Sequence, residues 1–234
     1  MNLRDRDEPS SIERPGVSTV REDRRPPAGG VRGEYARLAA EYDRRWATYN
    51  HRSVELLRPY LAGRDLGTTL DLGCGTGNLL PRLAEWGARA DRYVGADLSP
   101  EMLLGASARV SASPFPAALL AASSAAIPLR DGSVCTVVSA STLHDWDHPE
   151  GALAEARRVL RPGGRLLLLD WVRDRVTMRA LNLALRITRN PLHRMYSGDE
   201  VAALLGTAGF QVVSAERRAI TWMWGLLVIE AVRD

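Results

Sequence analysis

The sequence predicts an α/β fold, a doubly wound sheet of seven mostly parallel strands that ends in an antiparallel hairpin. Short apolar segments, typical of buried strands, alternate with helical segments between residues 66 and 171. A turn with three alternating glycines, residues 73–77, joins the first of these strands to the helix after it. Residues 210–214 and 222–232 are rich in strand formers and have no helical segment between them, which predicts the hairpin.

The composition is that of one globular domain with an appendage. A chain of 234 residues is long enough to bury a sizeable core. All 31 basic residues are arginine, which excludes a Schiff-base lysine or a lysine general base. The net charge of +3 is small, so we expect no nucleic-acid partner.

The cysteine and apolar patterns predict a cytoplasmic protein. Cys74 and Cys135 have neither a CxxC spacing nor a zinc-ligand spacing, so we expect no metal site and no disulfide. The N-terminus has no apolar segment typical of a signal peptide, and the longest apolar segments are too short to cross a bilayer.

Residues 1–30 differ in composition from the rest of the chain. They alternate arginine with acidic residues and contain few large apolar side chains, so they cannot bury enough surface to offset their ordering entropy. We expect a disordered N-terminal tail at 1–30 and a folded domain at 31–234.

The glycine turn at residues 70–78 carries the strongest functional signal. Its glycines permit positive φ and close approach of a ligand, and the helix behind it points its positive end at that ligand. Asp71 stands two residues before Gly73, where a carboxylate would repel the pyrophosphate of a dinucleotide and attract a cation. S-adenosylmethionine has cationic groups in place of phosphates, so Asp71 favours it over NAD. A capped turn without a ligand is the alternative.

Residues 71–77, DLGCGTG, resemble the first motif of the class I S-adenosylmethionine-dependent methyltransferases. Further motifs of this family follow at the expected separations, so the resemblance extends from about Tyr35 to the C-terminus. It implies a Rossmann-like fold with S-adenosylmethionine as the cofactor. The chain is most similar to the small-molecule branch, methyltransferase type 11, which includes quinone and lipid C- and O-methyltransferases. The turn residues expected to contact the cofactor are Asp71, Gly73, Cys74, Gly75 and Gly77.

A second carboxylate ends the next predicted strand, residues 92–97. Asp97 lies where doubly wound folds place an acid that accepts hydrogen bonds from the ribose hydroxyls. A helix-capping role is the alternative, but Ser99 already supplies the cap of the following helix. The resemblance implies that Leu98 and Met102 line the adenine pocket.

Two serines mark places where the chain departs from its relatives. The family usually carries an acid five residues before the proline at position 128, where it binds the adenine amino group, and this chain has Ser123. An uncharged hydroxyl would hold adenine less tightly. Ser139 lies at the end of the fourth predicted strand, 133–140, where the Asn/Asp-Pro-Pro-Tyr signature of nucleic-acid and protein amino-group methylation is absent. We expect Ser139 to contact the cofactor.

Residues 31–62 predict two helices, at 33–50 and 51–61, ahead of the sheet. Tyr35, Tyr42 and Trp46 share one face of the first helix. Core packing is one interpretation of this aromatic stripe. Because the fold needs no extra helix to complete its core, we expect a cover over the cofactor, with the three rings closing over its cation.

Catalysis of methyl transfer requires alignment of the acceptor with the methyl group and exclusion of water. An acceptor hydroxyl or acidic C–H also requires a base. His144 follows the fourth strand at its carboxyl end and is the candidate base, with Asp145 as the residue that orients it. A capping or structurally satisfied histidine is an equal alternative.

An insertion at residues 172–196 interrupts the alternation of strand and helix. Its helical segment, 176–188, combines apolar residues with arginines. We expect a substrate lid with solvated arginines. The alternative is a basic amphipathic helix in transient contact with a membrane surface.

The expected function is S-adenosylmethionine-dependent transfer of a methyl group to a small, partly hydrophobic acceptor, by C- or O-methylation. One other class is a methyltransferase-like binding module without activity, which Ser123 would favour. The other is an NAD-dependent Rossmann oxidoreductase. Asp71 and Asn78 argue against it, because the NAD fingerprint requires glycine or alanine at position 78.

Overall fold

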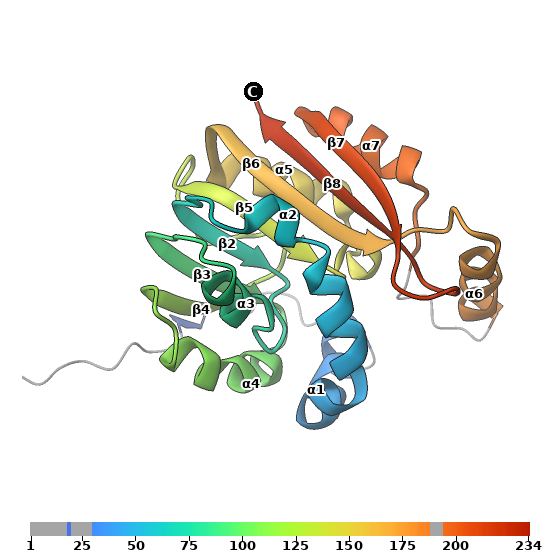
Figure 1. Cartoon of the computed structure of the whole chain (residues 1–234), viewed down its shortest axis with the longest axis horizontal. Helices are drawn as coiled ribbons and strands as arrows, with labels where there is room; N and C mark the ends of the chain where they lie inside the picture. Colours follow the sequence, from blue (N-terminus) through green and yellow to red (C-terminus); the bar gives the residue numbers. More distant parts are fainter. Residues whose placement is uncertain (1–17, 20–29, 188–193) are drawn as a thin grey trace, which may run out of the picture.

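The structure, a computed structural model, describes residues 18–19, 30–187 and 194–234. Its strands form one sheet in the order β1-β4-β3-β2-β5-β6-β8-β7 (Figure 1). Strands β1 to β6 pair in parallel, and β8 is antiparallel to both β6 and β7. The doubly wound, mostly parallel sheet and its C-terminal hairpin are therefore confirmed. The strands are β1 Ser18–Thr19, β2 Thr68–Leu72, β3 Arg92–Asp97, β4 Ala117–Ala121, β5 Val134–Ala140, β6 Leu160–Trp171, β7 Phe210–Ala219 and β8 Gly225–Arg233.

The sheet has one strand more than predicted. The additional strand, β1, contains only two residues and pairs in parallel with β4 at the sheet edge. It belongs to the segment for which we predicted disorder. The rest of that segment, residues 1–17 and 20–29, lies outside the described residues, so its disorder stays a prediction.

The helices occur in the predicted order. They are α1 Val31–Glu55, α2 Arg58–Leu61, α3 Leu79–Glu85, α4 Pro100–Ser111, the 3-10 turn η1 Leu143–Asp145, α5 Pro149–Val159, α6 Val176–Ile187 and α7 Gly198–Thr207. The predicted caps are present, because the Ser99 hydroxyl accepts from the Met102 N–H, and Ser197 with Glu200 forms a capping box.

The first helix is longer than predicted. Residues 51–55 continue α1 in place of starting a second helix, because nothing in this stretch breaks the helical hydrogen bonds. Only the residues from Arg58 form a separate helix, and Pro59 in its first turn lacks the N–H that a continuous helix would require. One long helix therefore runs from Val31 toward the sheet.

Three strand boundaries also differ from the prediction. β6 starts at Leu160, ahead of the predicted glycine turn, and its pairing with β5 jumps from Leu160 to Arg165 across residues 161–164. The hairpin pairs from Phe210↔Arg233 to Ala219↔Gly225, so β7 is longer and β8 starts later than the apolar pattern indicated. Pairing across the hairpin, which the pattern of one strand does not contain, sets these ends.

The sheet is buried on both faces. Along β6, Leu166 and Leu168 belong to one apolar cluster with α5 and α7, whereas Leu167 and Leu169 belong to another with α2 and α3. A strand buried on both sides needs no polar alternation, which explains the continuous leucine run. The two clusters fix the layer order of helix, sheet and helix.

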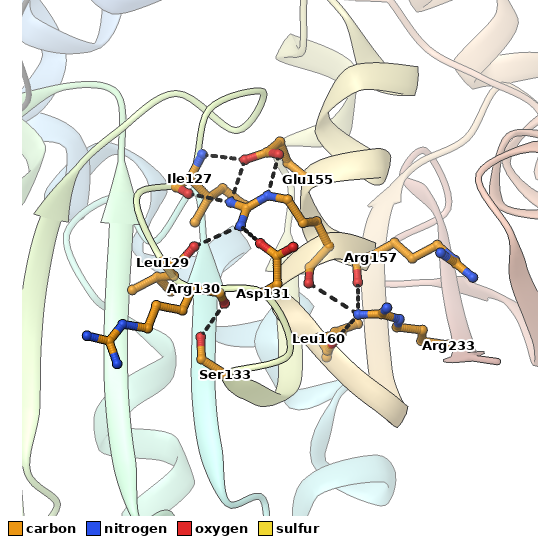
Figure 2. Close-up of polar contacts among 10 residues, drawn as sticks. Ile127, Leu129, Arg130, Asp131, Ser133, Glu155, Arg157, Leu160 and Arg233 are labelled. Atoms are coloured by element: carbon orange, nitrogen blue, oxygen red, sulfur yellow. Dashed lines mark hydrogen bonds and ion pairs between the residues drawn. The ribbon is translucent and has the colours of Figure 1, made fainter.

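Polar contacts connect the segment before β5 to α5 and the C-terminus (Figure 2). Glu155 on α5 accepts a hydrogen bond from the Ile127 N–H at 2.8 Å. Arg233, at the end of β8, donates to the backbone carbonyls of Arg157 and Leu160. These contacts hold α5 between the segment before β5 and the end of β8.

The chain leaves β2 in one direction toward β3 and β4, and later returns to the other side of β2 with β5. Parallel sheets bind ligands outside the carboxyl ends of the strands at such a switch point. The site is therefore expected at the ends of β2, β3 and β5. None of the helices in the described ranges has both the length and the apolar content needed to cross a bilayer.

Candidate functional site

A cavity of about 210 Å³ opens at the carboxyl ends of β2, β3 and β5. It combines residues from the glycine turn, both strand-end carboxylates, the start of α4 and the aromatic face of α1. The predicted site residues that line it are Tyr35, Tyr42, Asp71, Gly73, Cys74, Gly75, Asp97, Leu98, Met102, Ser123 and Asp145. The predicted site residues that do not line it are Trp46, Gly77, Ser139 and His144.

The glycine turn has the backbone that its residues predict. Gly73, Gly75 and Gly77 have φ values of +78°, +54° and +78°, a region that residues with a Cβ rarely adopt. A Cβ on Gly73 would lie 2.3 Å from the Thr142 side chain, and one on Gly77 would lie 3.2 Å from Ala106 on α4. Gly77 thus serves the packing of the turn against α4, which explains why it lies outside the cavity.

Asp71 is a buried carboxylic acid at the end of β2. Its Oδ2 accepts a hydrogen bond from the Tyr93 hydroxyl at 2.6 Å. Burial raises the pKa of Asp71 to about 7, although the bond from Tyr93 acts in the opposite direction. A cation placed in the cavity would favour the ionised form of this carboxylate.

Asp97 is held by the backbone on both of its oxygens. Oδ2 accepts from the Gly75 N–H at 2.8 Å, and Oδ1 accepts from the Ser99 N–H at 2.9 Å. Burial nevertheless raises the pKa of Asp97 above its ordinary value. The carboxylate is fixed in orientation beside Gly75, and its remaining lone pairs can accept hydrogen bonds from two ligand hydroxyls.

Helix α1 supplies one wall of the cavity. The rings of Tyr35 and Tyr42 both line it, with centroids 6.0 Å apart. The Tyr35 hydroxyl donates to Asp145 Oδ2 at 2.7 Å, which connects α1 to the segment after β5. Trp46 lies further along the helix and packs edge-on against Tyr49. It borders a second cavity of about 70 Å³ in place of the first.

His144 lies in a buried polar cluster behind the main cavity and borders the second one. Its Nδ1 donates to Asp170 Oδ1 at 2.6 Å, its Nε2 lies 3.6 Å from Asp145 Oδ2, and its ring stacks on Trp171 at 4.2 Å. Asp170 also accepts from the Leu143 N–H at 2.6 Å. The strongest orienting contact to His144 therefore comes from Asp170, a residue that the sequence did not single out.

The protonation of His144 conflicts with a role as base. Burial lowers the pKa of His144, but Asp145 and Asp170 together outweigh burial and raise it to about 9. An imidazole with that pKa carries its proton at neutral pH and cannot accept another. Asp145, predicted to orient His144, is the member of this cluster that lines the cavity.

Ser139 has a structural role in this fold. Its hydroxyl donates to the Leu72 carbonyl oxygen at 2.9 Å and lies 2.5 Å from the Thr142 hydroxyl. It therefore connects the ends of β2 and β5 beneath the cavity. Ser141, two residues later, has a φ of +59° and lines the cavity itself. The left-handed backbone at Ser141 turns the chain at the end of β5, so that Ser141, for which no role was predicted, lines the cavity and Ser139 does not.

An ion pair on the rim of the site was not predicted. Asp43 on α1 accepts from the Thr76 hydroxyl at 2.6 Å and from Arg109 on α4 at 2.8 Å, and Arg109 also donates to the Thr76 carbonyl. In the sequence, Thr76 lies 33 positions from Asp43, and Arg109 lies 66 positions from it. A pattern of local spacing contains no signal for such contacts.

The described residues of the predicted lid are not part of the cavity lining. No described residue of the insertion at 172–196 lines the main cavity, and residues 188–193 lie outside the described part of the chain. Figure 1 shows α6 outside the sheet, next to the connection between β7 and β8.

Comparison with known proteins identifies relatives over most of the domain. A family described as "Methyltransferase domain" matches residues 70–168. The chain is 34% identical over 195 residues to a malonyl-[acyl-carrier protein] O-methyltransferase of Geobacter sulfurreducens, which covers 78% of this chain and 70% of the relative. It is 40% identical over 141 residues to an uncharacterized methyltransferase of Mycobacterium bovis, covering 57% of this chain and 53% of the relative.

The chain spans about half the length of that mycobacterial relative and of a 37.1 kDa protein in a transposon of Streptomyces fradiae. Among solved structures, the magnesium protoporphyrin IX methyltransferase of Synechocystis, with bound S-adenosylhomocysteine, has the same fold with a TM-score of 0.65 and 18% identity. This likeness covers 87% of the present chain and 98% of the other.

Proposed function

Because the chain belongs to the class I S-adenosylmethionine-dependent methyltransferases, we propose that it transfers a methyl group to a small, partly hydrophobic acceptor, by C- or O-methylation. The observation that carries the proposal is a pair of carboxylates, the buried Asp71 and the half-buried Asp97, which lie at the ends of adjacent strands around the glycine turn and both line the cavity.

The residues of the cavity fit the cofactor of the family. Gly75 brings a backbone without a side chain next to Asp97, whose oxygens the Gly75 and Ser99 amides already orient. The proposal assigns the ribose hydroxyls to Asp97 and the cationic amino acid end to Asp71. When bound, S-adenosylmethionine supplies a methyl group already activated by its sulfonium charge.

The adenine side of the proposal involves three lining residues. Met102 is buried under the turn and Leu98 is partly exposed at the cavity rim, so together they offer apolar contact to a flat ring. Ser123 also lines the cavity and offers an uncharged acceptor for the adenine amino group. Its side chain already accepts from the Ala125 N–H at 3.2 Å, which fixes its position.

The acceptor side of the proposal involves α1 and the segment after β5. The proposal gives Tyr35 and Tyr42, whose rings line the cavity, the task of excluding water, as methyl transfer requires. The structure supports Asp145 over His144 as the group that takes the proton of an acceptor hydroxyl or acidic C–H. Asp145 lines the cavity, and it is oriented by the Tyr35 hydroxyl on one side and His144 on the other.

Calorimetric titration with S-adenosylhomocysteine tests the cofactor assignment. We expect binding by the wild-type chain and a loss of about tenfold or more in Asp97→Asn, because hydrogen bonds to a charged acceptor contribute more than those to a neutral one. Asp91→Asn is the matched control, because Asp91 is exposed ahead of β3 at the opposite end of the strand. NADH should not bind.

Absence of S-adenosylhomocysteine binding at millimolar concentration would support the binding module without methyltransferase activity and end the proposal. Tighter binding of NADH would support the oxidoreductase. If the cofactor binds, transfer of a labelled methyl group to quinols and to small carboxylic acids, followed by identification of the methylated atom in the product, then separates C- from O-methylation.

A further inference from the structure

We propose that the outer face of α6 and the neighbouring hairpin connection form a contact surface for an anionic lipid membrane. We call this surface the α6 patch. Its residues are Arg175, Val176, Arg179, Leu183 and Trp222. The proposal is independent of methyl transfer, because none of these residues lines either cavity.

The outer face of α6 is apolar, whereas the solvent-facing side of a surface helix is normally polar. Val176 is 79% exposed and Leu183 is 59% exposed, and the exposed Ala180 lies between them. Positions i, i+4 and i+7 share one side of a helix, so these three side chains form one continuous row. Met178, in contrast, is fully buried on the inner side. The helix thus has an apolar side for its own protein and a second apolar side that faces outward.

A tryptophan extends this row from another element. Trp222, between β7 and β8, is 77% exposed, the most exposed aromatic side chain among the large hydrophobic residues of the described chain. Two hydrogen bonds fix the connection to the start of α6, from Thr177 to the Met223 carbonyl at 2.8 Å and from Arg175 to the Trp222 carbonyl at 3.0 Å. These bonds hold the backbone of Trp222 and Met223 at the start of α6, and Figure 1 shows both elements at the same edge of the molecule.

The positive charge beside this apolar row favours an anionic partner. Arg175 and Arg179 are exposed at the start of α6, and their side chains donate hydrogen bonds to the backbone carbonyls of Trp222 and Arg173. Neither guanidinium has a carboxylate within ion-pair distance among the described residues, whereas Arg173 and Arg217 nearby are paired with Glu200 and Asp174.

An apolar row bordered by uncompensated arginines and by a tryptophan matches the boundary between acyl chains and anionic headgroups. Tryptophan prefers this level of a bilayer because its ring is apolar and its N–H is polar. Arginines beside a shallowly inserted apolar face add attraction to negative lipids.

Cosedimentation with vesicles tests the proposal with the full chain. We expect the wild-type protein to sediment with vesicles made of equal parts phosphatidylglycerol and phosphatidylcholine, and to do so weakly with phosphatidylcholine alone. Binding should fall as salt is raised, because screening weakens the arginine contribution. Trp222→Ser should reduce binding about tenfold, and Arg175→Gln with Arg179→Gln about tenfold or more.

Leu104→Ser is the matched control, because Leu104 is 70% exposed on α4 and lies outside the α6 patch. It should bind vesicles like the wild type. All substituted positions are exposed, and thermal unfolding checks that each variant folds. The proposal is overturned if wild-type protein stays in the supernatant, or if the patch variants bind as well as Leu104→Ser. It is equally overturned if Trp222→Ser abolishes a dimer in solution while vesicle binding is absent, since a second copy would then be the partner.

Discussion

The two strand-end carboxylates show how much a short motif determines at the residue scale. The spacing of Asp71 and Asp97 from the glycine turn predicted that both would face one site, and both line the cavity. The partners that set their properties could not be predicted. Tyr93 lies 22 residues from Asp71, and its hydroxyl points inward from the neighbouring strand. Such contacts depend on the packing of the sheet and leave no mark in local spacing.

The pKa of Asp71 predicts pH-dependent cofactor binding. Because that pKa is raised to about 7, the carboxylate is mostly protonated below neutrality and attracts a cation weakly. Affinity for S-adenosylmethionine should therefore rise about tenfold between about pH 6 and about pH 8. Asp71→Asn should bind weakly at both values and lose this dependence. Calorimetry at matched ionic strength measures the affinity at each pH. If Asp71→Asn kept the pH dependence of the wild type, Asp71 would not be the group that binds the cation.

The pKa of His144 predicts a contribution to stability in a different pH window. The folded pKa of about 9 exceeds the ordinary value of 6.5, so the stabilisation is complete below about pH 6.5 and is lost as pH rises through about 9. His144→Gln should cost about 3–5 kcal/mol near neutrality, because it leaves Asp145 and Asp170 without their shared cation.

Urea unfolding between about pH 6 and about pH 10 measures how the stabilisation by protonated His144 is lost as the pH rises. The difference between wild type and His144→Gln should narrow across that window. His148→Gln, at an exposed position, should stay within about 0.5 kcal/mol of wild type. If the difference in unfolding free energy between wild type and His144→Gln stayed constant across the whole pH range, packing of His144 against Trp171, rather than its charge, would account for the loss of stability.

At the element scale, α1 illustrates a helix whose type was predicted and whose end was not. The aromatic spacing predicted the helix and the face it turns toward the site, and Tyr35 and Tyr42 lie on that face. Trp46 has the same periodicity but lies beyond the cavity, beside Tyr49. Helical spacing fixes a direction around the axis, whereas the position along the axis depends on where the helix meets the sheet.

The contact from α1 to the glycine turn predicts coupling between helix position and cofactor affinity. Burial raises the pKa of Asp43, but the bonds from Thr76 and Arg109 prevail and lower it, so the ionised form is favoured in the fold. Asp43→Asn should weaken cofactor binding about threefold to tenfold, although Asp43 does not line the cavity.

Hydrogen exchange separates this effect from general destabilisation. In Asp43→Asn, amides of α1 and of the turn at residues 73–78 should exchange faster, whereas those of β6 and β8 should not. Glu41→Gln is the matched control, because Glu41 lies on the same helix in an exposed pair with Arg44. Equal acceleration in both variants would mean that α1 responds to any loss of charge.

For the whole molecule, the alternation of strand and helix was sufficient to predict the layered sheet, because strands buried on both faces read as apolar runs such as residues 166–169. The two-residue strand β1 was not predictable. A pair such as Ser18 and Thr19 has no strand pattern of its own, and only the free edge of β4 gives it a partner.

Deletion of residues 1–29 tests whether the domain at 31–234 carries the site by itself. The deletion keeps Gly30, which precedes α1, and Val31, which lines the cavity. Because β1 contributes two residues at a sheet edge, we expect the free energy of unfolding to fall by less than about 1 kcal/mol, and S-adenosylhomocysteine affinity to stay within about twofold. Urea unfolding and calorimetry measure both. A tenfold loss of affinity without a loss of stability would instead place part of the N-terminal segment over the cofactor, and the cover would then consist of more than α1.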